Sequence, residues 1–147
     1  MSAVLESPKA SLRLTRQFAQ SREKVFRAWT DPQALKHWFA PDASAEIKAE
    51  IDLRVGGKYK ILILKSGGDR DCVGGVYREV KVASLLVFTW AWETTPERES
   101  LVTVELKDKD GGTELVLTHE RFFDEDARNR HEKGWSHLLG RLAQVHL

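Results

Sequence analysis

The sequence predicts an α+β fold in which a curved antiparallel sheet of about seven strands wraps around a long C-terminal helix. Three patterns predict it. Residues 43–121 alternate between apolar and polar side chains with the two-residue period of strands, and no helical segment interrupts them. Residues after Asp124 carry apolar side chains at helical spacing. Between a first strand and this sheet, two short helical patterns follow directly on each other.

The residue pattern near the N-terminus predicts one strand and the first short helix. Residues 11–18 alternate in the manner of a half-buried strand. Ser21 is a favourable N-cap, and a stripe follows it that consists of Val25, Phe26 and Trp29. This segment therefore forms a strand and a helix that buries one face.

The second short helix begins at Asp31 and Pro32. Aspartate is a good cap, and proline suits the first helical position because its missing N–H would be unsatisfied there anyway. We expect this helix to stop at Pro41 and to present Leu35, Trp38 and Phe39 as its apolar stripe.

Glycine-containing turns at 56–57, 66–69 and 108–112 interrupt the alternating region, in which we expect strands at 45–51, 59–63, 73–80, 85–92, 101–106 and 113–121. Short turns without helices imply an antiparallel meander, and a strongly twisted meander of this size curls. One helix covers only part of its concave face, so the remaining space is a natural ligand cavity. The sequence leaves open whether large side chains fill that space.

The last predicted element is the long helix. Asp124 caps it, and an apolar stripe runs along it at Ala127, His131, Trp135, Leu138, Leu139 and Leu142. Without repeats or linkers, the pattern predicts a flexible tail over residues 1–10 and a single domain over 11–147.

Composition restricts the partners and the location. Lys and Arg number 23 against 22 Asp and Glu, so electrostatics gives no reason to expect nucleic acid or an anionic membrane surface as a partner. No apolar run has the length of a signal peptide or a membrane span, so we expect no membrane insertion. The one cysteine, Cys72, cannot form an intrachain disulfide, and we expect a cytoplasmic protein.

Several motifs resemble one family when taken together. They are Ser21 to Pro32 running on to His37-Trp38-Phe39-Ala40-Pro41, the turn Gly56-Gly57-Lys58-Tyr59, the strand pair Gly74 to Val80 and Leu86 to Trp90, and Gly112 to His119 ahead of Gly134-Trp135. From Leu12 onward the chain resembles the START-like helix-grip (SRPBCC) superfamily, and within it the stand-alone homologues of the activator of the ninety-kilodalton heat-shock protein ATPase. The resemblance implies the helix-grip fold and a hydrophobic cavity for a small molecule.

Twelve residues are candidates for lining this cavity, because their predicted positions place aromatic, apolar or histidine side chains between the sheet and the helix. They are Trp38, Phe39, Tyr59, Ile61, Tyr77, Trp90, Trp92, Leu117, His119, His131, Trp135 and Leu138. Arg78, Glu79 and Arg121 are candidate polar anchors, although charged strand residues usually face solvent.

His119 is the candidate whose side chain could take part in a reaction as well as in binding. It shares the inward face of the last strand with Leu115 and Leu117, where a histidine either binds a ligand, acts as a base or is a satisfied core residue. His131 on the helix faces the same space or lies at its solvent edge. The sequence has no metal-ligand spacing and no phosphate-binding loop, so we expect neither a metal nor a cofactor.

Three function classes fit these observations. The leading one is a binding module that holds a small apolar or amphipathic molecule as a carrier, sensor or stress-related accessory. The second is a protein-interaction role, with a chaperone or a second copy of the chain as partner. The third is a cavity enzyme of the cyclase or hydrolase type with His119 as base, although the sequence shows no catalytic constellation.

Overall fold

The structure is a computed structural model that describes residues 10–42 and 44–145. Residues 1–9 of the predicted tail at 1–10 lie outside this description. The strands are β1 (Leu12–Phe18), β2 (Glu46–Ile51), β3 (Lys58–Leu64), β4 (Arg70–Lys81), β5 (Leu85–Trp92), β6 (Ser100–Lys109) and β7 (Gly112–Glu120). The helices are α2 (Arg22–Thr30), α3 (Pro32–Leu35) and α4 (Glu125–Leu142).

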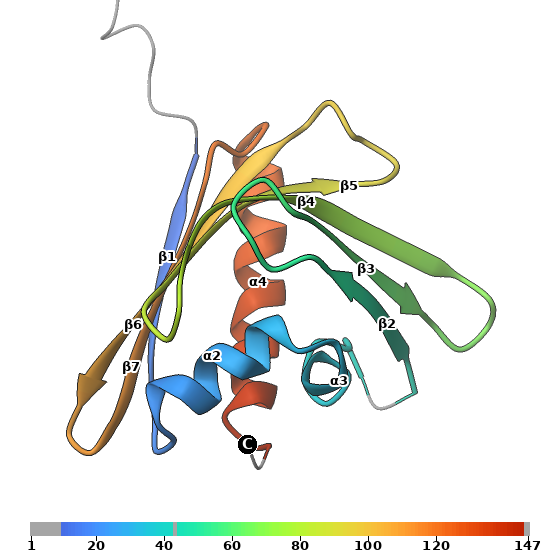
Figure 1. The fold of residues 1–147 in the computed structure, drawn as a ribbon. Coiled ribbons are helices and arrows are strands. Elements are labelled where there is room, and N and C mark those ends of the chain that lie inside the picture. The colour runs from blue at the N-terminus through green and yellow to red at the C-terminus, as the bar shows by residue number, and fades with distance from the viewer. Residues whose placement is uncertain (1–9, 43, 146–147) are drawn as a thin grey trace, which may run out of the picture.

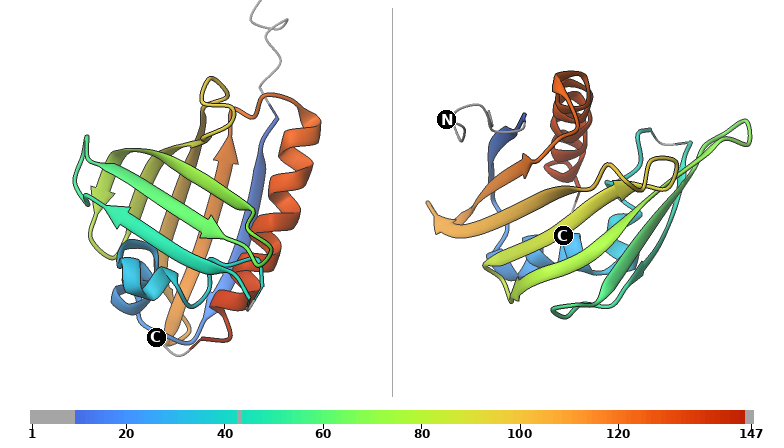
Figure 2. Two further views of the ribbon diagram at one scale, coloured as in Figure 1. Left: turned by 90° about the vertical axis from the view of Figure 1, so that its right-hand side faces the viewer. Right: turned by 90° about the horizontal axis from the view of Figure 1, so that it is seen from above.

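The seven strands form one antiparallel sheet in the order β1-β7-β6-β5-β4-β3-β2. The sheet is strongly curved, and α4 runs along its concave side (Figure 1). Helices α2 and α3 lie at one end of the arch, and the view from above shows α4 standing between its two arms (Figure 2). The predicted helix-grip fold is therefore confirmed.

Helix starts follow the predicted caps. The Ser21 side chain accepts a hydrogen bond from the Lys24 backbone N–H at 3.3 Å, and Asp31 accepts one from Gln33 at 2.9 Å. Asp124 caps α4 in the same way. Each cap satisfies one of the backbone donors that a helix N-terminus leaves without a partner.

The predicted end of the second short helix was wrong. Helix α3 stops at Leu35, and Trp38 and Phe39 lie in the turn that follows rather than in the helix. Trp38 is fully buried, and its indole N–H donates to the carbonyl of Ala28 in α2 at 2.9 Å. Tertiary packing of the two rings thus decides the chain direction here, and it overrides the local helical pattern.

Strand β4 is irregular in its pairing with β5, and an irregularity of this kind bends the strand that carries it. The Val76 N–H donates to the Thr89 side-chain oxygen at 2.8 Å instead of to a strand carbonyl, and the register shifts between Tyr77 and Glu79. A Cβ atom at Gly75 would lie 2.0 Å from the Thr89 carbonyl oxygen. The absence of a side chain therefore permits the close approach that the bend requires.

We expect Gly75→Ala to lower the free energy of unfolding by about 1–3 kcal/mol, the usual cost of overpacking. The added methyl group forces β4 away from β5 because the atom it meets is backbone. Gly134→Ala is the matched control, since a Cβ atom there meets nothing within 4 Å. That control should be neutral or stabilising in urea denaturation, and equal behaviour of the two variants would contradict this account of the bend.

Candidate functional site

The centre of the space between sheet and helix is filled by aromatic rings. The Trp135 ring from α4 lies 5.1 Å from Trp90 of β5, 5.6 Å from Trp29 of α2 and 6.1 Å from Phe39, measured between ring centroids. Only a void of about 20 Å³ remains beneath them. Tyr59, Ile61 and Tyr77 line this void, so side chains fill most of that part of the predicted cavity.

Two larger cavities open beside this aromatic centre. The first has a volume of about 330 Å³ and lies between the start of α4, the first residues of β4 and the connection from β5 to β6. The second has a volume of about 280 Å³ and lies between α4, the end of β3 and the segment after α3. The two share five lining residues: Asp71, Trp90, Trp92, Arg130 and His131.

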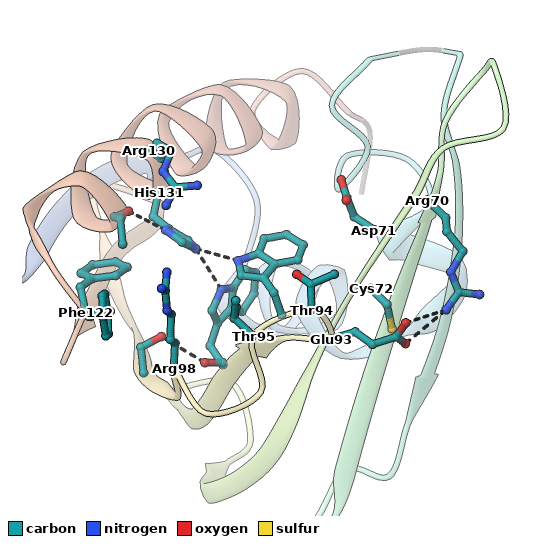
Figure 3. Close-up of a pocket in the computed structure, with 15 residues that line it drawn as sticks. Arg70, Asp71, Cys72, Glu93, Thr94, Thr95, Arg98, Phe122, Arg130 and His131 are labelled. Carbon is teal, nitrogen blue, oxygen red and sulfur yellow. Dashed lines mark hydrogen bonds and ion pairs between the residues drawn. The ribbon is translucent and has the colours of Figure 1, made fainter.

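The side chains of Trp92 and His131 line both cavities, and we call this pair the Trp92–His131 wall. Figure 3 shows His131 projecting from α4 toward the first cavity. His131 Nδ1 donates to the Ala127 carbonyl at 2.7 Å, so Nε2 carries the lone pair. The indole N–H groups of Trp92 and Trp90 donate to this Nε2 at 2.9 and 3.3 Å. Burial lowers the pKa of His131, in keeping with a neutral ring that accepts both bonds.

His119 belongs to a second, deeper chain of hydrogen bonds. The indole N–H of Trp135 donates to His119 Nδ1 at 3.0 Å, which places the ring proton on Nε2. Nε2 then lies 2.7 Å from the Ser100 hydroxyl, which itself donates to the Trp90 carbonyl at 3.1 Å. Every polar atom of this chain has a partner.

This environment defines what His119 can do. The residue is fully buried, and burial together with the nearby His131 lowers its pKa to about 2. Its lone pair is occupied by Trp135, and the ring lines neither cavity. His119 has the features of a satisfied core histidine and lacks the accessible lone pair that a general base needs.

The predicted site residues separate into three groups. Those that line the two cavities are Phe39, Trp90, Trp92, His131, Trp135 and Leu138. Tyr59, Ile61 and Tyr77 border the small void, and Trp38, Leu117 and His119 are buried away from all three spaces. Arg78, Glu79 and Arg121 are exposed and border neither cavity.

Sequence reasoning missed the charged residues of the cavities. Arg98 lies in the connection between β5 and β6, where no periodic pattern indicates a direction. Arg130 directly precedes His131 on α4 and lies at the edge of the cavity. An apolar stripe indicates only the apolar side chains of the buried face, so it gives no sign of a charged residue beside that face. Cys72 also lines the first cavity, and burial raises the pKa of its thiol, which disfavours the reactive thiolate.

Other kinds of site are not evident in the part of the chain that the structure describes. Within residues 10–42 and 44–145, no three His, Cys, Asp or Glu residues are grouped so that they could hold a metal ion. None of the helices described there has the length and apolarity needed to cross a membrane.

Solved structures of similar proteins share this architecture. Protein CV1439 from Chromobacterium violaceum matches with a TM-score of 0.80 and 27% sequence identity, over 92% of this chain and 96% of that one. The AHSA1 protein SPO3351 from Silicibacter pomeroyi matches with a TM-score of 0.77 and 32% identity, over 91% and 95%. CalU16 from Micromonospora echinospora is more distant, with a TM-score of 0.68 and 24% identity over 90% and 73%.

A comparison with curated proteins finds no match. The model of the family described as "Activator of Hsp90 ATPase homolog 1-like protein", in contrast, matches residues 19–146. This range contains α2, α3, six of the seven strands and all of α4. On this match and on the shared helix-grip fold, the chain belongs to the family of Activator of Hsp90 ATPase homolog 1-like proteins, within the START-like (SRPBCC) superfamily.

Proposed function

We propose that this protein binds a small, largely apolar molecule in the second cavity, between α4 and the concave face of the sheet. The observation that carries the proposal is an open volume of about 280 Å³ walled by Phe39, Ile63, Trp90, Trp135 and Leu138. Ligand cavities combine such an aromatic and aliphatic wall with a few polar groups, and this volume is at the small end of their usual range. Proteins of the SRPBCC fold family commonly bind hydrophobic ligands, which agrees with this assignment.

Binding fits the geometry better than catalysis does. The candidate base, His119, lines neither cavity, and both of its ring nitrogens are in hydrogen bonds. His131 does border the cavities, but its lone pair accepts two indole N–H groups. A carrier or sensor needs only the cavity and its walls.

Two glycines on α4 provide the test. Gly134 lines the second cavity, Gly140 does not, and a Cβ atom at either position meets nothing within 4 Å. Both are helical, so leucine at either one should raise helix stability by about 0.5–1 kcal/mol. Gly134→Leu places a side chain in the cavity, whereas Gly140→Leu leaves the cavity empty.

We expect the neutral dye N-phenyl-1-naphthylamine to bind the wild-type protein and Gly140→Leu equally, and Gly134→Leu at least about tenfold more weakly. Dye fluorescence reports binding, and quenching of the cavity tryptophans gives a second readout. Equal binding by all three proteins would show that the dye sits elsewhere. No binding to the wild-type protein or to Gly140→Leu would contradict the proposed function.

A further inference from the structure

The charged residues around the two cavities do not balance. Four cations and two carboxylates line them: Lys65, Arg70, Arg98, Arg130, Asp71 and Glu93. Both carboxylates are already paired within this set, since Lys65 lies 2.7 Å from Asp71 and Arg70 lies 2.9 Å from Glu93. Arg98 and Arg130 therefore supply an unbalanced positive charge to the lining.

The carboxylates nearest to these two arginines lie outside the cavities. Arg130 Nε is 3.2 Å from Asp126, whose side chain is 79% exposed, and Arg98 Nε is 3.8 Å from the adjacent Glu97. Exposed ion pairs of this kind are weak because water screens both charges. Each guanidinium therefore retains donors for a ligand, at little cost in lost contacts.

The arginines are also well placed for a shared ligand. Arg98 reaches the first cavity from the β5–β6 connection, and its guanidinium carbon lies 3.9 Å from the centroid of the Phe123 ring, a cation–π contact that orients it. Arg130 projects from α4 and lines both cavities. Figure 3 shows both arginines on the α4 side of the first cavity, away from the neutral ion pair between Arg70 at the start of β4 and Glu93 just after β5.

We propose that the ligand is an organic anion whose apolar body lies in the second cavity and whose charged oxygen group is bound by Arg130 and Arg98. This proposal rests on the proposed function and adds the chemical class of the ligand. Guanidinium groups bind oxyanions through paired N–H donors, and they do so more strongly where apolar walls exclude water. The Trp92–His131 wall and Leu138 provide the apolar contacts beside Arg130 in the second cavity, while the Arg130 side chain itself is 65% exposed and so is accessible to a ligand from solvent.

Two dyes that share one apolar body test the charge preference directly. 8-Anilinonaphthalene-1-sulfonate carries an anionic sulfonate, and N-phenyl-1-naphthylamine is its neutral counterpart. We expect the wild-type protein to bind the sulfonate at least about tenfold more tightly than the neutral dye. In the double variant Arg98→Gln/Arg130→Gln this ratio should fall to near one, because only the neutral contacts remain.

Arg54→Gln/Arg22→Gln is the matched control, because it removes the same charge from two arginines that line neither cavity. It should keep the wild-type ratio. If the wild-type protein binds both dyes equally at the Gly134-dependent site, the anion proposal is wrong and the proposed function stands. The anion proposal is also wrong if both double variants change the ratio alike or if neither does. If neither dye binds, the proposed function itself fails.

Discussion

Trp135→Ala is expected to lower the free energy of unfolding by about 3–5 kcal/mol, the usual cost of removing a large ring from a packed core. Trp135 is 2% exposed, and it connects α4 with α2, β5 and the segment after α3 through its ring contacts. Removing it opens a void at the centre of the fold and leaves His119 Nδ1 without a donor. Urea denaturation followed by far-UV circular dichroism measures the loss.

Two further variants separate packing from hydrogen bonding. Trp135→Phe keeps an aromatic ring but lacks the indole N–H, so it should cost about 1–3 kcal/mol. Trp92→Ala removes a ring of the same type from a half-buried position and should cost less than Trp135→Ala. If Trp135→Ala is no less stable than Trp92→Ala, then Trp135 does not hold the centre of the fold.

The stability of the protein should fall steeply as the pH is lowered from 7 to 4, and His119 should account for about 3 kcal/mol of that fall. Burial holds the pKa of His119 in the folded state at about 2, compared with an ordinary value of 6.5. In this window the unfolded chain takes up a proton that the folded chain does not. Stability is therefore present above pH 6.5 and is lost as the pH falls, by about 1.4 kcal/mol per pH unit.

His119→Gln tests this assignment, because an amide can donate to Ser100 and accept from Trp135 but does not titrate. The variant should have a shallower dependence of unfolding free energy on pH between 4 and 6.5. His131 contributes in the same direction, since burial lowers its pKa too. An unchanged slope in His119→Gln would contradict the prediction.

The two histidines also hold the aromatic lining of the cavities in place. His131 fixes the rings of Trp90 and Trp92, and His119 fixes Trp135 and, through Ser100, the backbone of Trp90. Because tryptophan side chains held by both packing and hydrogen bonds cannot rotate freely, the Trp92–His131 wall keeps its position beside both cavities. A ligand in the second cavity therefore meets a rigid aromatic surface.

The sequence by itself determined most of the architecture. Side-chain periodicity and caps at Ser21, Asp31 and Asp124 specified the strands, the helices and their order, because these signals are local. The alternation of side chains along the last strand also placed His119 on the inner face of β7, where it is fully buried. The resemblance in the motifs led to the family that the comparisons show.

Only the tertiary structure decided which parts of the interior are filled and which are open. Periodicity tells which face of an element is buried, but the fit between rings from different elements depends on distances that no local pattern contains. Hence Tyr59 and Tyr77, although inward, border a void of only about 20 Å³, whereas Leu138 borders a cavity of about 280 Å³. Arg98 lies in the connection between β5 and β6, and Arg130 lies on α4, 32 positions later in the sequence. The two line one cavity because the sheet curves around α4 (Figure 1), and no local sequence pattern contains that curvature.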